Sequence, residues 1–168
     1  YDYATLSNNQ TSISKISTNL GIIYHASGET NKSYTYLQEA IDAAIKVGSV
    51  KNQVSAAINL GVFFTEKGKF DRAKALFEDT LTKSTDSNLI YQKCISYTNL
   101  GDLHFELGDI DKALDYHKEA LKVAKEFSLL YEEGVSNLSI AKILLLNKED
   151  AENYLQSSFE IFNKTDEL

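Results

Sequence analysis

The sequence contains no proline, no methionine and no tryptophan, and its only cysteine is Cys94. Without proline, no helix loses a backbone N–H donor, so long uninterrupted helices are allowed. A lone cysteine cannot form an internal disulfide, and the sequence therefore gives no support for an oxidising compartment. No stretch approaches the roughly 18 apolar residues of a membrane span, and no signal-peptide pattern opens the chain. We expect a cytoplasmic protein.

Negative charge predominates over positive charge. The 168 residues carry a formal net charge of −7, and 43% of them are hydrophobic and 24% charged. That apolar fraction is enough to build a core, which argues against a disordered chain. A negative field repels phosphate backbones and acidic lipid headgroups, so we expect neither nucleic acid nor a membrane surface as a partner.

The sequence resembles itself at a shift of 40 residues. The triplet Asn-Leu-Gly begins at three positions with this spacing, Asn19, Asn59 and Asn99. Seven residues after the glycine of each triplet stands a second glycine, at Gly28, Gly68 and Gly108. A fourth, degraded copy is assigned to Asn137, 38 residues after Asn99, with Leu146 where the second glycine is expected. Self-similarity at such a period is the mark of stacked supersecondary units.

Each unit is predicted to be a pair of helices joined by a tight turn. After Gly68, apolar residues recur with helical spacing, as in Phe70, Ala73 and Phe77. Glycine suits the end of the first helix because it can adopt the left-handed conformation. The four predicted repeats cover residues 12–47, 51–84, 89–126 and 130–163, and we expect one continuous array over residues 1–168.

Residues 1–7 are predicted to be the tail of a preceding second helix. Tyr3 and Ala4 fall in register with Val123 and Ala124, three repeats later. A missing partner helix would leave an apolar face uncovered, and such faces drive association. We therefore expect that the exposed ends of the array allow self-association.

The spacing of small and aromatic residues resembles the tetratricopeptide repeat. Leu60, Gly61, Phe64, Gly68 and Ala73 match that pattern in the second unit. The 40-residue period is similar to the variant found in Pins/LGN-type adaptors and in Rap-type peptide receptors. The resemblance implies an all-α fold, a right-handed superhelical solenoid of about four helix-turn-helix repeats. It also implies that the first helix of each pair lines a concave groove.

An asparagine precedes the Leu-Gly position in every unit, at Asn19, Asn59, Asn99 and Asn137. Asparagine is a mediocre helix former, so four copies inside helices need a reason beyond propensity. Its amide offers an acceptor and two donors, the complement of an extended peptide backbone. The resemblance implies that these asparagines contact the backbone of a bound peptide. Alternatively, they bond to a neighbouring helix and fix the repeat geometry, or are inherited from an ancestral repeat.

Family geometry places further side chains around this row of asparagines, namely Ile22, Val62, Glu66, Asp102, Phe105 and Glu106. The groove would then be apolar along its floor and acidic toward the third unit. Such a surface favours a peptide with hydrophobic anchors and a basic residue. The alternative is that the three acidic residues only form a solvated face.

The sequence predicts no enzyme, cofactor or metal site. His104 and His117 occupy positions expected in the core of the third unit, and further ligands for a metal are missing. Cys94 fits a small buried residue better than a nucleophile. The segment from Gly28 to Ser33 ends like a phosphate-binding loop, but Asn31 stands where the glycine before lysine is required. No paired acid and base or activated nucleophile is apparent.

The leading hypothesis is therefore an adaptor or scaffold module that binds a peptide or disordered segment of a protein partner in the concave groove. The alternative is the peptide-sensing domain of a larger signalling or regulatory protein.

Overall fold

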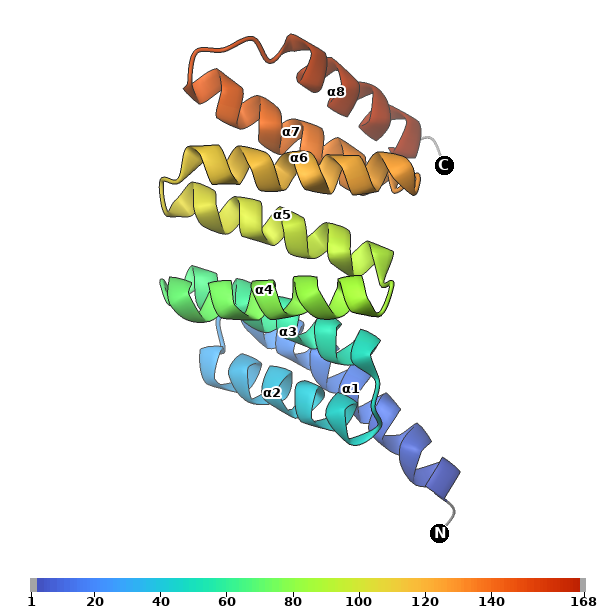
Figure 1. Cartoon of the computed structure of the whole chain (residues 1–168). Coiled ribbons are helices and arrows are strands. Elements are labelled where there is room, and N and C mark those ends of the chain that lie inside the picture. Colours follow the sequence, from blue (N-terminus) through green and yellow to red (C-terminus); the bar gives the residue numbers. More distant parts are fainter. Residues whose placement is uncertain (1–2, 167–168) are drawn as a thin grey trace. The chain divides into compact units, whose positions relative to one another are not determined.

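The structure is a computed structural model that describes residues 3–166, with side chains described from residue 9 to residue 164. This part of the chain consists of α-helices and contains no strand (Figure 1). The helices are α1 (Tyr3–Ala26), α2 (Thr30–Lys46), α3 (Val50–Glu66), α4 (Phe70–Asp86), α5 (Ile90–Glu106), α6 (Ile110–Glu126), α7 (Leu130–Leu146) and α8 (Glu152–Asp166). None of these helices is both long enough and apolar enough to cross a membrane.

The turns between helices share one hydrogen-bond pattern. After α1, the Gly28 N–H donates to His25 O at 3.0 Å and the Glu29 N–H donates to Tyr24 O at 2.9 Å. These two bonds close a Schellman motif around a left-handed residue, here Gly28 with φ 76°. Gly48, Gly68 and Gly108 occupy the same place in later turns, and so do Asn88, Ser128 and Lys148. A helix stop therefore recurs every 20 residues, and two such stops make the 40-residue repeat.

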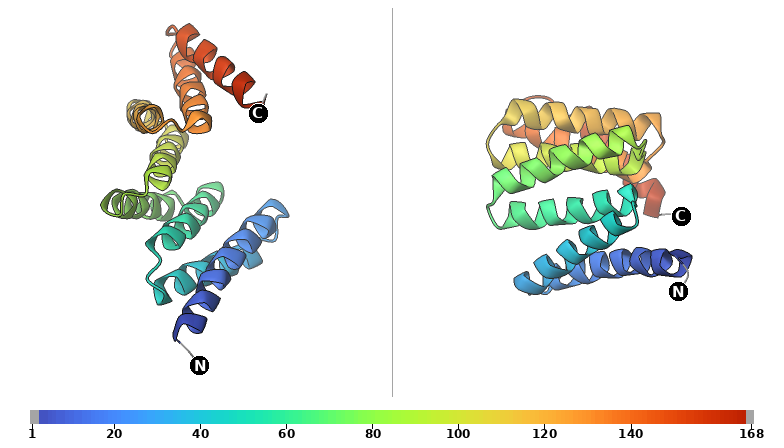
Figure 2. Two further views of the ribbon diagram at one scale, coloured as in Figure 1. Left: turned by 90° about the vertical axis from the view of Figure 1, so that its right-hand side faces the viewer. Right: turned by 60° about the horizontal axis from the view of Figure 1, so that its bottom comes forward.

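The chain divides into two compact units between Gln92 and Lys93. In the first unit, consecutive helices from α1 to α4 run antiparallel to each other (Figure 2). Gly21 and Gly61 lie where the helices of each hairpin come closest, because a Cβ at these positions would clash with the side chains of Leu37 and Phe77, respectively. Leu37 and Phe77 are in turn almost fully buried.

The second unit is built in the same way from α5 to α8. Gly101 faces the ring of His117, and a Cβ there would lie 2.7 Å from the nearest ring atom. Between α6, α7 and α8 lies an apolar cluster of Leu121, Ile140, Ala141, Leu144 and Ala151. Each unit thus buries the apolar faces of two helical hairpins.

The fold class predicted from the sequence, all-α with tetratricopeptide-type hairpins, is confirmed. The prediction for residues 1–7 is wrong within the described range. Residues 3–7 are the first turns of α1 and not the end of a separate helix, whereas residues 1 and 2 lie outside the described part. Whether the repeats form one continuous array stays a prediction.

The assignment of the fourth repeat was out of register by two residues. The left-handed turn residue after α7 is Lys148, which lies 40 residues after Gly108. The counterpart of Asn99 is therefore Ser139 and not Asn137, and Ala141 takes the place of Gly101. In addition, the connection before α8 is longer than the others, because α7 ends at Leu146 and α8 begins at Glu152.

Candidate functional site

Asn59 and Asn99 lie at equivalent positions of α3 and α5 and are partly exposed. In each case the side-chain Nδ2 donates to the carbonyl four residues earlier in the same helix. Asn59 bonds to Ser55 O and Asn99 to Ile95 O, both at 2.8 Å. This bond uses one N–H of the amide and fixes its orientation. The Oδ1 acceptor and the second N–H are left for a ligand.

Asn19 on α1 is exposed and lines a groove of about 310 Å³ in the first unit. Lys15 and Thr18 of α1 line the same groove, and Asn52 and Ser55 of α3 form its other side. The groove therefore lies between the first helices of the two hairpins. Because its walls are largely amides and hydroxyls, it can form hydrogen bonds to a polypeptide backbone.

Asn137 does not belong to this exposed row. Its side chain is 1% exposed, and Nδ2 donates to Ser157 Oγ of α8 at 3.1 Å. This asparagine connects the two helices of the last hairpin, which is the structural alternative considered for the row. Ser139, the true counterpart of Asn99, is partly exposed.

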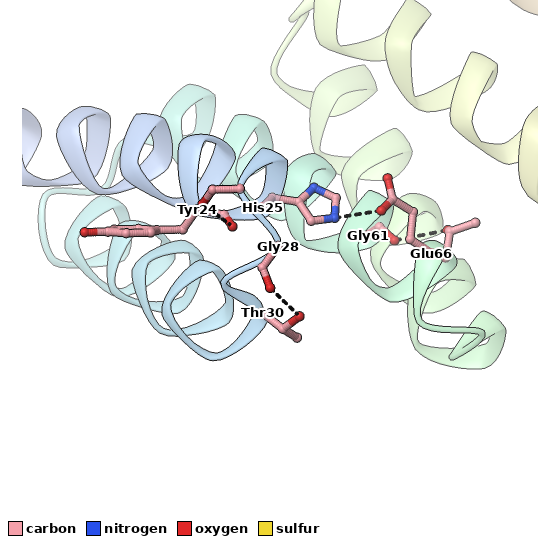
Figure 3. Close-up of polar contacts among 8 residues, drawn as sticks. Tyr24, His25, Gly28, Thr30, Gly61 and Glu66 are labelled. Atoms are coloured by element: carbon pink, nitrogen blue, oxygen red, sulfur yellow. Dashed lines mark hydrogen bonds and ion pairs between the residues drawn. The ribbon is translucent and has the colours of Figure 1, made fainter.

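The other candidates of the first unit lie on α1 and α3. Ile22 is 44% exposed and Val62 is partly buried. Glu66 is exposed, and its Oε2 lies 2.9 Å from His25 Nε2 (Figure 3). The His25 ring also packs against Phe63, with 5.7 Å between centroids. Glu66 thus joins the C-terminal ends of α1 and α3, and its charge is partly engaged within the protein.

Asp102, Phe105 and Glu106 follow one another along α5 in the second unit. The Asp102 side chain is 60% exposed, but surrounding protein atoms displace part of its solvent and raise its pKa to about 6. Lys142 of α7 opposes this rise and Glu106 adds to it. The Lys142 Nζ stands 4.3 Å from the centroid of the Phe105 ring. The predicted acidic surface therefore contains a cation that offsets it.

Lys142 was missed by the sequence analysis although a signal was present. It lies 40 residues after Asp102 and thus holds the repeat position of Ile22, Val62 and Asp102. Because the fourth repeat was aligned two residues too early, Lys142 was not recognised as the residue at this repeat position.

The second unit buries the titratable side chains of His104, His117 and Cys94. Burial lowers the pKa of His117 to about 4, with a further lowering by Lys142, so the ring is neutral near pH 7. His104 is also buried, and its ring stacks on Tyr116 at 5.3 Å. Burial, helped by Glu132, raises the pKa of the Cys94 thiol to about 12, which suppresses the nucleophilic thiolate. Among the described residues, no three His, Cys, Asp or Glu side chains gather as metal ligands.

Solved structures of several proteins have the same fold. BtubC from P. vanneervenii is 18% identical, with 91% of this chain and 64% of that protein covered and a TM-score of 0.78. Aspartyl phosphate phosphatase F from Bacillus subtilis is 14% identical, with 95% and 42% covered and a TM-score of 0.85. The Rap conjugation gene regulator of the plasmid pLS20, in complex with a Phr peptide, is 22% identical, with 93% and 43% covered and a TM-score of 0.79.

These identities show a shared fold only. The chain spans 42% to 64% of the length of these three proteins. The resemblance to Rap-type proteins thus extends to their fold, and no curated protein matches the chain. A sequence profile of the tetratricopeptide repeat matches residues 12–85 and 92–164. Because this match covers most of the sequence, the chain belongs to the tetratricopeptide repeat family.

Proposed function

We propose that the chain is a protein-interaction module that binds an extended peptide, or a disordered segment of a partner, on its first helices. The observation that carries this proposal is the common geometry of Asn59 and Asn99. Each amide is held by its own helix at 2.8 Å and keeps one donor and one acceptor for a ligand. A peptide backbone presents the complementary pair at every residue.

The surroundings of the two asparagines support the same ligand class. In the first unit, the groove beside Asn19 has polar walls, and Ile22 offers an exposed apolar contact nearby on α1. In the second unit, the exposed Asp102, Glu106 and Lys142 provide charges of both signs next to the Phe105 ring. Such a surface fits a peptide with an apolar anchor and a charged residue beside it.

The resemblance to a regulator bound to a Phr peptide also favours a peptide ligand. Because this chain spans 43% of that protein's length, a second candidate function is the peptide-sensing part of a larger regulator. Both candidates share the same binding step. They differ in the response that binding triggers, and the sequence of the complete gene product distinguishes them.

The proposal is tested by selecting a peptide from a displayed random library on the native chain and measuring its Kd. The variant Asn59→Ala, Asn99→Ala removes up to two ligand hydrogen bonds per asparagine, each worth about 0.5 to 1.5 kcal/mol. We expect each substitution to weaken binding by about tenfold, since 1.4 kcal/mol is a factor of ten.

The buried Asn137 supplies the matched control. Asn137→Ala should lower stability, but the protein that stays folded should bind the peptide as tightly as the native chain does. If Asn59→Ala, Asn99→Ala instead leaves the Kd unchanged, the exposed asparagines do not bind the ligand and the proposal is wrong.

A further inference from the structure

A second pocket lies in the first unit, at the opposite end of α3 from the groove beside Asn19. Its volume is about 700 Å³, and it opens where α2 begins, α3 ends and α4 begins. This volume falls within the range of roughly 300 to 1,000 Å³ found for small-ligand sites. Nothing in the peptide-binding proposal uses this pocket.

Aromatic side chains form one wall of the pocket. The Tyr34 ring of α2 lies 6.1 Å, centroid to centroid, from both Phe63 and Phe64 of α3. The two phenylalanines are nearly buried, whereas Tyr34 is 40% exposed. Tyr34 therefore supplies most of the aromatic surface that a ligand can reach.

Three cationic side chains surround this wall. Arg72 lies 5.5 Å and Lys69 lies 5.9 Å from the centroid of the Phe64 ring, and Lys67 lies 6.0 Å from that of Phe63. Attraction between a cation and a ring face holds such groups in place. All three residues are exposed, and among the described side chains none of them has a carboxylate within ion-pair distance.

The equivalent turns of the other repeats do not carry this charge. Glu29 pairs with Lys32 at 2.5 Å after α1, and Asp109 pairs with Lys112 at 2.6 Å after α5. At the corresponding positions after α3 stand Lys69 and Arg72. The acidic residue that neutralises a cation in the other two turns is thus replaced by a second cation.

The electrostatics of helix α4 do not explain this replacement. Lys69 is the N-cap residue of α4 and Arg72 lies in its first turn. A cation near a helix N-terminus opposes the helix dipole, and two like charges three residues apart repel each other. An arrangement that weakens the free protein is expected where a ligand compensates for it.

We propose that this pocket binds a phosphate monoester attached to an aromatic group. The phosphate would lie among Lys67, Lys69 and Arg72, and the ring would lie against Tyr34. Asn31 of α2 lines the same pocket and brings an amide donor, whereas the hydroxyls of Thr30 and Thr35 already donate to Gly28 O and Asn31 O. A phosphate offers three terminal oxygens, and arginine and lysine are its usual partners in proteins. In a chain of net charge −7, a local group of three cations gives the pocket selectivity for anions.

The test is calorimetric titration of the native chain with O-phospho-L-tyrosine and with adenosine monophosphate. These probes represent the two kinds of molecule that carry a phosphate monoester on an aromatic group, a phosphorylated tyrosine side chain and a free nucleotide. Tyrosine, adenosine and inorganic phosphate are the matched partial ligands. We expect at least one phosphorylated probe to bind more tightly than its unphosphorylated form, by a factor of about ten or more. The unphosphorylated form cannot make the charge-assisted hydrogen bonds of the phosphate.

Lys69→Glu is the informative variant, because the corresponding turns carry Glu29 and Asp109 at this position. The new glutamate should form an ion pair with Arg72, so the melting temperature should stay the same or rise. The Kd of the phosphorylated probe should increase by about tenfold or more. Lys69→Gln removes the charge without adding another and covers the case in which the first variant folds poorly. Lys122→Glu, an exposed charge reversal on α6, is the control and should not change the Kd.

Tyr34→Ala should reduce the affinity for the aromatic phosphate to that for inorganic phosphate. The source whose probe binds more tightly is the better candidate for the natural ligand. The proposal is overturned if neither phosphorylated probe saturates the pocket, if tyrosine and adenosine bind as tightly as their phosphates, or if Lys69→Glu and Lys69→Gln both leave the Kd unchanged.

Discussion

Gly61 lies where α3 and α4 come closest, and the edge of the Phe77 ring occupies the space that a side chain would need. The Leu37 side chain occupies the corresponding space beside Gly21. The small residue Ala73 lies one turn before Phe77 on α4. Ala73 is buried, but the atoms nearest to Gly61 belong to Phe77. The close approach therefore depends on one glycine and one large residue.

Gly61→Ala should destabilise the chain by about 1 to 3 kcal/mol, the usual range for overpacking a core. Alanine is a better helix former than glycine by about 1 kcal/mol, so a stabilised variant would show that the Phe77 ring can move away at little cost. Urea denaturation measures the difference. A second variant, Gly61→Ala with Phe77→Leu, tests the cause, because the smaller side chain should relieve part of the clash and make the two effects non-additive.

The pH dependence of stability is expected to report the buried His117. Its pKa is lowered to about 4 in the folded protein, against an ordinary value of 6.5. Between these values the unfolded state binds more protons, so stability is present above pH 6.5 and is lost as the pH falls toward 4. The loss should approach about 3 kcal/mol, at 1.36 kcal/mol per unit. Urea denaturation at pH 7 and pH 5 measures most of it.

His117→Phe is the matched variant, because Phe77 holds this position against Gly61 in the preceding repeat. It should remove the loss of stability on acidification. The raised pKa of Asp102 acts in the opposite direction, since it stabilises the folded state at low pH and loses that effect as the pH rises through 6. This contribution is small because the carboxylate is largely solvated. An unchanged pH profile in His117→Phe would contradict the assignment.

At the scale of helices, the asparagines separate into two kinds. Asn59 bonds to its own helix, whereas Asn137 bonds from α7 to Ser157 of α8 and is buried. Asn137→Ala leaves the Ser157 hydroxyl without this partner and opens a small void between the two helices. We expect a destabilisation of about 1 to 3 kcal/mol, the range for an unsatisfied buried group. Asn59→Ala should be near neutral, because alanine favours the helix. Thermal melts of both variants check this contrast, and equal losses would contradict it.

Most helices could be predicted from the sequence because their ends repeat. The recurring glycines and the helical spacing of apolar residues placed the ends of the first three predicted repeats within two residues of the observed helix ends, apart from the start of α1. The fourth repeat could not be placed as well, since Lys148 adopts the left-handed conformation without being a glycine. The counterpart of Asn99 is Ser139, but the pair Asn137-Leu138 two residues earlier resembles the Asn-Leu of the other repeats. The fourth repeat was therefore aligned on Asn137. That one error also concealed Lys142, and the charge of the second unit's surface was misjudged as a result.

For the whole molecule, the repeat architecture predicts that stability is distributed along the chain. In repeat proteins stability is approximately a sum over repeats and neighbouring interfaces, so local opening need not be all-or-none. The structure shows two compact units, and the apolar cluster around Ile140 is built by residues of the second unit. The family pattern alone did not reveal this division, because the 40-residue period runs through Gln92 and Lys93 without a change in composition.

Hydrogen exchange of backbone amides is expected to resolve the two units. Gly61→Ala loosens the packing of α3 on α4, so protection should fall in these two helices by a factor that matches the loss measured by urea denaturation. Asn137→Ala should produce the reciprocal result, with faster exchange in α7 and α8. In each variant the amides of the other unit should keep most of their protection, because their own hairpins are unchanged. A uniform loss of protection across α1 to α8 in both variants would show instead that the chain opens as a single cooperative body, and stability would then not be a sum of local contributions.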